Sequence, residues 1–206
     1  MLFGIFIYDG VEPIDLATFG VLSMARRIAP HIRICTIAPK MGMVRLSNGL
    51  DVVAQFGINE APNCDVVIVT GGPGWEDQSR SPATLSYIRR IHASGKVASV
   101  CTGAMILAAS GVLDGSAATT KRAVVAPEFS PLERMRDMHP RIDVREAAMV
   151  DTGAVVTGGG VSLCIDTTLY ILEQMLGEQV ADDTARILEY QRARKANRDP
   201  EAFLAR

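Results

Sequence analysis

The chain has 206 residues, a formal net charge of −2 and charges of both signs interspersed along it, so its composition gives no reason to expect a nucleic-acid or membrane partner. Hydrophobic residues make up 48% of the chain and aromatic residues only 5%, which favours one compact domain over residues 1–206 with an aliphatic α/β core. The four cysteines are far apart and form no C-x-x-C pair, which argues against a zinc site or a redox pair and favours a reducing cytoplasm.

Strands alternate with helices along the chain, a pattern that indicates a mainly parallel sheet with helices on both faces. The apolar run at 2–8 is nearly continuous, which is typical of a strand buried on both faces. Apolar residues at helical spacing predict the buried face of the first helix; they are Ile14, Ala17, Val21, Ala25 and Ile28. The expected elements, in chain order, are a strand at 2–8, a helix from 12 to 30, a strand at 32–38, a hairpin over 44–53 turned at Asn48-Gly49, a strand at 65–70, a helix from 81 to 95, a strand and helix over 97–109, a strand at 116–120, a loop and helix over 123–138, a hairpin of 142–150 with 154–157, and helices at 161–176 and 180–196.

The central stretch, residues 97–109, places a cysteine between a short β-branched run and a run of small residues with high helix propensity. This pattern predicts a strand, a sharp turn and a helix, with the thiol of Cys101 at the turn. A helix N-terminus favours the thiolate, which is the reactive form of cysteine, and we therefore interpret Cys101 as a nucleophile. The remaining cysteines are expected to be structural thiols; they are Cys35, Cys64 and Cys164.

Ligands of such a sheet bind beyond the carboxyl ends of its strands, and four loops are expected to meet there. They cover residues 8–15, 70–75, 101–102 and 119–122. The turn at 71–74 matches no phosphate-binding motif. Its glycines nevertheless let backbone amides face a developing anion, and the amides of Gly72 and Thr102 are the expected donors. Trp75, the single tryptophan, either walls the pocket or packs at the surface.

An acid or base is needed beside the thiol, and no histidine falls in these loops. No histidine is therefore placed to act as the base for Cys101, as one does in enzymes with a cysteine-histidine pair. The available carboxylates are Asp15 and Glu12, at the start of the first predicted helix. Acidic residues are also common there because they interact favourably with the helix dipole, so the pattern alone leaves a structural role open for both.

Taken together, motifs across nearly the whole chain resemble the ThiJ/PfpI family of the class I glutamine-amidotransferase-like superfamily. The motifs are Ile14-Asp15-Leu16, Gly71-Gly72-Pro73-Gly74, Ser99-Val100-Cys101-Thr102-Gly103-Ala104, the run 107–115 with Ala118-Thr119-Thr120, Thr157-Gly158-Gly159-Gly160, Ile165-Asp166 and Leu188-Glu189-Tyr190. The Cys-Thr-Gly sequence and the aspartate of Ile-Asp-Leu are similar to the isocyanide hydratase-like branch. That branch also includes sensor-like domains of AraC-type regulators.

The resemblance implies a flavodoxin-like three-layer sandwich with a nucleophile elbow, a homodimer and a small-molecule substrate, without a cofactor or metal. It implies Cys101 as nucleophile and Asp15 as acid/base. In isocyanide hydratases the thiolate adds to the isocyanide carbon, and the resulting thioimidate is hydrolysed to an N-formamide. Thr102 would form a hydrogen bond near the thiol. The remaining pocket residues expected from the match are Gly71, Gly72, Thr120, Lys121 and Trp75.

One departure from the branch follows Thr120, where Lys121-Arg122 replaces the usual histidine and tryptophan. A cation there would favour the thiolate, bind an anionic ligand or point to solvent.

Two other functions stay open. One is a ligand- or stress-sensing domain like that of AraC-type regulators, although we expect the 29 residues after Gly177 to form one helix with a charged end rather than a helix-turn-helix domain. The other is a glyoxalase-like thiol enzyme, although those branches place histidine after the nucleophile and glutamate at the acidic position. We expect a cytoplasmic hydratase or hydrolase with a covalent thiol intermediate.

Overall fold

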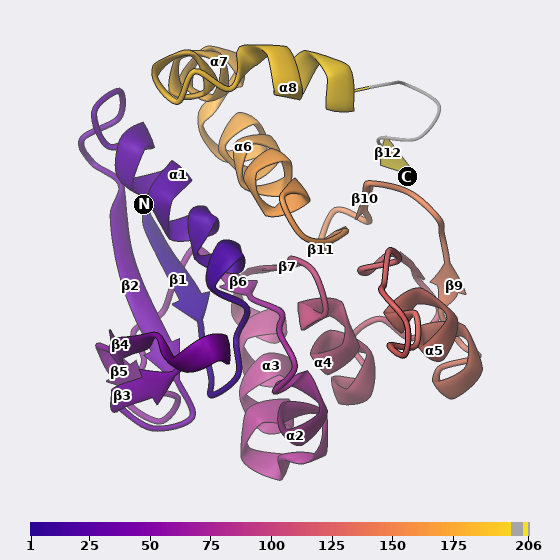
Figure 1. The fold of residues 1–206 in the computed structure, drawn as a ribbon. Coiled ribbons are helices and arrows are strands. Elements are labelled where there is room, and N and C mark those ends of the chain that lie inside the picture. Colours follow the sequence, from indigo (N-terminus) through magenta and orange to yellow (C-terminus); the bar gives the residue numbers. More distant parts are fainter. Residues whose placement is uncertain (199–203, 206) are drawn as a thin grey trace.

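The structure is a computed structural model that describes residues 1–198 and 204–205. Its centre is an eight-stranded sheet with the strand order β12-β10-β11-β7-β6-β1-β2-β5 (Figure 1). The strands are β1 (Leu2–Phe6), β2 (Arg33–Ala38), β5 (Phe56–Gly57), β6 (Val66–Val69), β7 (Lys96–Ser99), β10 (Met149–Asp151), β11 (Val155–Gly158) and β12 (Leu204–Ala205). Every pairing is parallel except that of β10 with β11. The expected domain also includes residues 199–203 and 206, which lie outside the described residues.

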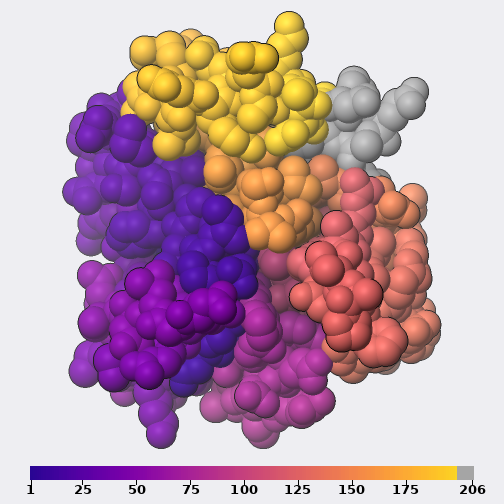
Figure 2. Space-filling model, in the orientation of Figure 1, coloured from indigo at the N-terminus to yellow at the C-terminus, as the bar shows by residue number. Residues whose placement is uncertain are grey.

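Helices cover both faces of this sheet, so the expected three-layer α/β sandwich is confirmed (Figure 1). The first layer contains a 3₁₀ turn η1 (Pro13–Leu16), α1 (Ala17–Ala25), α6 (Leu163–Leu176), α7 (Glu178–Ile187) and α8 (Gln191–Asn197). The opposite layer contains α2 (Trp75–Arg80), α3 (Pro82–Ser94) and α4 (Gly103–Ser110), and α5 (Pro131–Met138) lies at one side. In the space-filling view, α7 and α8 (yellow) form one end of the molecule (Figure 2). No helix in the described part of the chain is both long and apolar enough to cross a membrane.

The central strands form as their composition predicts. All four residues of β6 are buried, because a parallel strand with helices on both faces has no solvent-exposed side. The hairpin at Asn48-Gly49 is also confirmed. There β3 (Gly42–Arg45) pairs antiparallel with β4 (Asp51–Ala54), and both turn residues have positive φ, 61° and 87°.

The first helix differs from its expected phase. It begins as the 3₁₀ turn η1, whose three residues per turn shift the side chains relative to an α-helix. Ile14, expected in the core, is therefore 42% exposed, whereas Asp15 is completely buried. This shift directs the carboxylate toward the end of the sheet.

Two further elements differ from the expectation because the chain bends within them. The hairpin with 154–157 is confirmed for residues 149–151, where β10 pairs antiparallel with β11. The earlier part of the segment forms a separate strand, β9 (Asp143–Val144), which pairs with β8 (Ala117–Ala118). The tail at 180–196 forms α7 and α8 rather than one helix. Glu189 between them has a φ of 55°, which an α-helix does not allow.

Candidate active site

Cys101 occupies the turn between β7 and α4, at the carboxyl edge of the sheet. Its backbone φ is 53°, a conformation that residues other than glycine rarely adopt. The amide of Cys101 donates a hydrogen bond to the Gly159 carbonyl at 3.0 Å, and its carbonyl accepts one from Oγ1 of Thr120 at 2.8 Å. The predicted nucleophile elbow is confirmed, and neighbouring segments hold it on both sides.

The glycine turn after β6 packs directly against this elbow. A Cβ atom on Gly71 would lie 2.4 Å from the amide nitrogen of Thr102 and 2.7 Å from Cβ of Cys101. On Gly103 it would lie 2.2 Å from the carbonyl oxygen of Val69. All three distances are far shorter than a normal non-bonded contact, so glycine is required at both positions for the two turns to meet.

Asp15 reaches the same place from η1. Its Oδ2 accepts a hydrogen bond from the Gly71 amide at 2.6 Å, while its Oδ1 is buried and has no hydrogen-bond partner in the described part of the chain. Burial, with a smaller contribution from the charge of Glu12, raises the pKa of Asp15 to about 7 against the opposing effect of the Gly71 amide. A buried carboxyl group of this kind changes protonation near neutral pH, as a catalytic acid or base must.

The thiol of Cys101 is protonated at neutral pH, contrary to the expected bias toward the thiolate. Burial, followed by the charge of Asp15, raises the pKa of Cys101 to about 12, while the amide and hydroxyl of Thr102 and the charge of Lys121 oppose this shift. Desolvation therefore outweighs the helix N-terminus and the nearby cation. A protonated thiol must lose its proton to react as a nucleophile, and Asp15 is the carboxylate near enough to influence the pKa of Cys101.

Thr102 lies where the resemblance implied, beside the thiol. Its Oγ1 accepts a hydrogen bond from the Gly72 amide at 2.8 Å. The expectation that the Gly72 amide is an oxyanion donor is therefore wrong, because this amide already donates its hydrogen bond to the threonine hydroxyl.

Tyr8 is a further residue of this site, and the sequence did not point to it. Its side chain is fully buried and donates a hydrogen bond to the Thr70 carbonyl at 2.9 Å. Its phenol lies close enough to Asp15, Cys101 and Thr102 to interact with all three.

Cys101 and Thr102 line a cavity of about 520 Å³. All four predicted loops contribute to this cavity, so their convergence is confirmed. Apolar side chains form much of the wall: Pro73, Trp75, Val124, Phe129, Pro131 and Val161. Charged side chains also line it: Glu12, Glu76, Lys121, Glu128 and Arg134.

Four of these five charged side chains form two ion pairs. Nζ of Lys121 lies 3.3 Å from a carboxylate oxygen of Glu128. The guanidinium of Arg134 lies 2.7 Å from a carboxylate oxygen of Glu76 and 4.8 Å from the ring centre of Trp75. Trp75 thus forms part of the pocket wall rather than packing at the surface, which were the two positions expected for it. Glu76, Phe129 and Arg134 were not anticipated, since they come from α2, α5 and the loop before α5, which only the tertiary structure brings together, as the pairing of Arg134 with Glu76 shows.

Two of the expected pocket residues lie outside the cavity wall. The Gly71 amide donates a hydrogen bond to Asp15, and the Thr120 hydroxyl donates one to the Cys101 carbonyl. Through these hydrogen bonds, Gly71 positions Asp15 and Thr120 positions Cys101.

The remaining cysteines differ in burial and surroundings. Cys35 is buried and Cys64 half-buried, with their sulfur atoms 3.9 Å apart. Cys164 is buried near Asp15 and Cys101 and donates to the Ile14 carbonyl; burial raises its pKa. In the ranges that the structure describes, no group of three or more His, Cys, Asp or Glu side chains is arranged to hold a metal ion.

Comparisons with known proteins agree with this architecture. Residues 4–174 match the model of the DJ-1/PfpI family. An isonitrile hydratase from Pseudomonas putida is 30% identical over 192 residues, which cover 91% of this chain and 77% of that protein. The HTH-type transcriptional regulator GlxA from Rhizobium meliloti is 30% identical over 161 residues, which cover 76% of this chain but only 45% of the regulator.

Solved structures show the same fold at lower identity. A ThiJ/PfpI family protein from Pseudomonas syringae has a TM-score of 0.78 at 22% identity, with 95% of this chain and 83% of that chain covered. Drosophila melanogaster DJ-1beta has a TM-score of 0.75 at 18% identity, with 91% and 96% covered. The family match, which covers most of the chain, leads to the identification: this chain belongs to the DJ-1/PfpI family.

Proposed function

We propose that this protein is a cysteine-dependent hydratase that converts small isocyanides to N-formamides. The observation that carries the proposal is the buried pair of Cys101 and Asp15, whose carboxyl group titrates near pH 7 beside a protonated thiol. The similarity to an isonitrile hydratase over most of both chains supports the same chemistry.

The first step joins the thiol to the terminal carbon of the isocyanide. Asp15 accepts the proton of Cys101 as the sulfur attacks, and a carbon–sulfur bond forms. The carboxyl group then delivers the proton to the same carbon, which becomes the C–H of a thioimidate. Because the carboxylate is regenerated and no electron is gained or lost overall, this step needs neither an oxidant nor a metal.

The second step hydrolyses the thioimidate. Asp15 takes a proton from water as the hydroxide adds to the carbon of the C=N bond, and the carboxyl group passes this proton to the nitrogen. The hydroxyl group of the tetrahedral intermediate then gives its proton to the Asp15 carboxylate as the carbon–sulfur bond breaks. The sulfur takes up that proton from the carboxyl group, and the N-formamide leaves. One carboxyl group with a pKa near 7 serves both steps, since it must accept and donate a proton in turn.

The cavity suits such a substrate. An isocyano group is small, linear and uncharged, so it can approach a buried sulfur without a charged partner. The apolar wall formed by Trp75, Phe129 and Val161 favours an aryl or alkyl group at its other end.

Ligand sensing without turnover is the second candidate function. The similarity to GlxA supports it, although this chain spans less than half of that regulator. In this case the pocket would bind a small molecule and the thiol would stay unmodified.

The test is to incubate the protein with 4-nitrophenyl isocyanide and separately with methylglyoxal, and to follow formamide and lactate by mass spectrometry. Formamide production that is lost in both Cys101→Ala and Asp15→Asn supports the proposal. Lactate production would favour a glyoxalase-like enzyme. If neither substrate is turned over, the hydratase proposal fails and a sensor role gains support.

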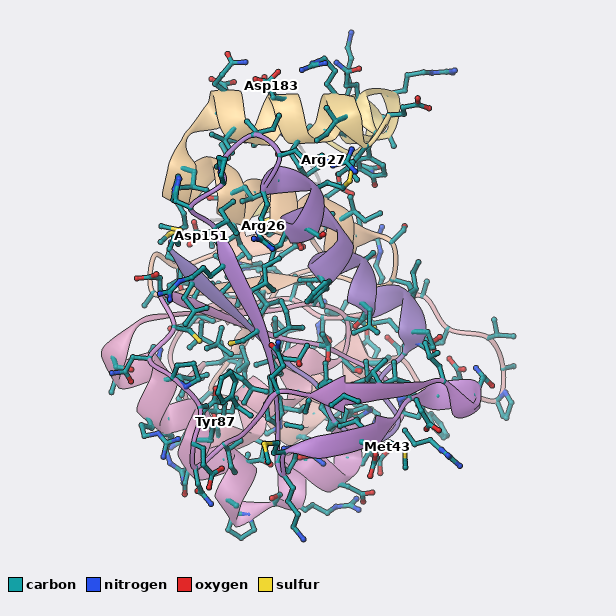
Figure 3. All side chains as sticks on the ribbon, turned by 90° about the vertical axis from the view of Figure 1, so that its left-hand side faces the viewer. Arg26, Arg27, Met43, Tyr87, Asp151 and Asp183 are labelled. Atoms are coloured by element: carbon teal, nitrogen blue, oxygen red, sulfur yellow. The ribbon has the colours of Figure 1, made fainter. Side chains whose placement is uncertain are left out.

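We also propose that the protein is a homodimer. Met43 and Val53 lie opposite each other on β3 and β4 and are 71% and 68% exposed; Figure 3 shows Met43 on this hairpin. Burying these side chains against a second copy would remove apolar surface from water. Light scattering tests this: a dimer that becomes monomeric in Met43→Glu supports the proposed interface, whereas a monomeric wild type contradicts it.

A further inference from the structure

We propose that the pocket selects isocyanides that carry a carboxylate, and that Lys121 binds this group. The inference rests on the hydratase function and adds the class of substrate. It makes Lys121 a specificity-determining residue of this chain.

Neighbouring groups hold the stem of Lys121 beside the nucleophile. The preceding residue, Thr120, donates its hydroxyl to the Cys101 carbonyl, and the Lys121 carbonyl accepts a hydrogen bond from the Leu132 amide at 3.1 Å. A Cβ atom built on Gly160 would lie 3.0 Å from both Cβ and Cγ of Lys121 and 3.1 Å from the sulfur of Cys101. The lysine stem and the sulfur therefore lie against the same glycine, and the ammonium group reaches Glu128, another residue of the cavity wall.

The present partner of this ammonium group is easily replaced. Nζ of Lys121 lies 3.3 Å from Glu128, and the two side chains are 20% and 61% exposed. An ion pair with so exposed a partner contributes little stability. A substrate carboxylate can take the place of Glu128, which then returns to water at small cost.

The other charged side chains of the cavity are engaged elsewhere. Arg134 is bound to Glu76 and stacks on Trp75. Glu12 lies near Asp15, where its charge contributes to the raised pKa of that group. Of the two cations that line the cavity, Lys121 is thus the one whose partner is largely in solvent.

Substrate dimensions follow from this arrangement. The isocyano carbon must reach the sulfur of Cys101 while the carboxylate reaches the end of the Lys121 side chain, so a ring or short chain has to separate the two groups. Trp75 and Phe129 provide apolar surface for that spacer. An aryl isocyanide with a carboxylate on the ring satisfies all three requirements.

The experiment compares kcat/KM for 4-isocyanobenzoate with that for its uncharged methyl ester. We expect the wild type to prefer the acid by at least ~10-fold, the factor for one charge-assisted hydrogen bond. In Lys121→Met the ratio should fall to about 1, as charge pairing is lost, and Lys121→Arg should restore most of it. Arg122→Met removes a neighbouring cation that pairs with Glu146 instead, and its ratio should match the wild type.

The outcomes separate this inference from the function on which it rests. Turnover of the ester without preference for the acid would overturn the role of Lys121 and leave the hydratase intact. If neither compound is turned over, the proposed hydratase function fails, and binding of the formamide products then tests whether Lys121 binds a carboxylate. Because Trp75 is the single tryptophan, its fluorescence reports this binding directly. Tighter binding of 4-formamidobenzoate than of its methyl ester, lost in Lys121→Met, supports the anion site, and equal binding overturns it.

Discussion

Replacing Asp15 with asparagine should remove a pH-dependent destabilisation that the buried carboxylate imposes on the fold. Asparagine has nearly the same shape, and its side-chain oxygen can still accept the hydrogen bond from the Gly71 amide. It carries no charge at any pH, so it reproduces the protonated form of the carboxyl group. The variant therefore isolates the free energy of ionising Asp15 in its buried position.

The size of this effect follows from the pKa of Asp15, which is about 7 in the folded protein against an ordinary 3.8. Below pH 3.8 the group is protonated in both the folded and the unfolded state, and it has no pH-dependent effect on stability. Between pH 4 and pH 7 the unfolded chain loses its proton first, so the folded state becomes progressively less stable. The decrease in the free energy of unfolding is complete just above pH 7. At about 1.36 kcal/mol for each pKa unit, it amounts to about 4 kcal/mol.

The assay is urea denaturation of the wild type and of Asp15→Asn in parallel from pH 4 to pH 8. Groups other than Asp15 contribute equally to both proteins and cancel in the difference. We expect the variant to gain about 4 kcal/mol relative to the wild type across this range, while its hydratase activity is lost. Asp77→Asn, at an exposed position of α2, controls for the chemical change itself. A difference between wild type and Asp15→Asn that stays constant with pH would refute the reasoning.

Four further predictions concern the site and its packing. The kcat/KM for a neutral isocyanide should rise as pH passes the pKa of Asp15, near 7, because the carboxylate must accept the thiol proton; a flat profile from pH 5.5 to 8 would rule out that role. Iodoacetamide should alkylate Cys101 more slowly in Asp15→Asn than in the wild type at pH 8, since the Asp15 carboxylate, with a pKa of about 7, is ionised there and accepts the thiol proton; equal rates by peptide mass spectrometry would contradict this role. Gly71→Ala should lower the free energy of unfolding by about 2 kcal/mol or more, because its Cβ would lie 2.4 Å from the Thr102 amide. Gly20→Ala, a helical position with open space around it, should raise that free energy by about 1 kcal/mol. Urea denaturation measures both, and a Gly71→Ala variant as stable as the wild type would show that the two turns are not in tight contact.

The predictable parts of the fold are those in which a local rule decides the structure. The uninterrupted, β-branched apolar run of β6 favours a strand buried on both faces, and all four of its residues are buried. Asn48-Gly49 tolerates the positive φ values of its turn. Ser81 caps α3 by accepting a hydrogen bond from the Thr84 amide, as its place before a proline and a helical run predicts.

Elsewhere the sequence pattern fails because tertiary contacts decide. Helical spacing placed Ile14 in the core, but the 3₁₀ turn puts Asp15 there, and the Gly71 amide holds it. The break at Glu189 has no glycine or proline to announce it. The short pairing of β8 with β9 joins segments that are separated by a loop and a helix, and no local signal encodes it.

The same distinction applies to the site. Cys101, Thr102 and Asp15 belong to contiguous motifs, and their positions could be predicted. Arg134 and Phe129 come from a loop and helix whose packing against α2 has no signature in the sequence. The protonation state of Cys101 was predicted wrongly because a helix N-terminus is a local feature, whereas burial depends on the whole fold.

The most direct test of the proposed mechanism is to find the covalent intermediate. Rapid quenching of the wild type with 4-nitrophenyl isocyanide, followed by peptide mapping, should show the mass of one isocyanide added at Cys101 and none at Cys164. The Cys101→Ala variant should form neither this adduct nor the formamide. Formamide production by Cys101→Ala at the rate of the wild type would contradict the mechanism.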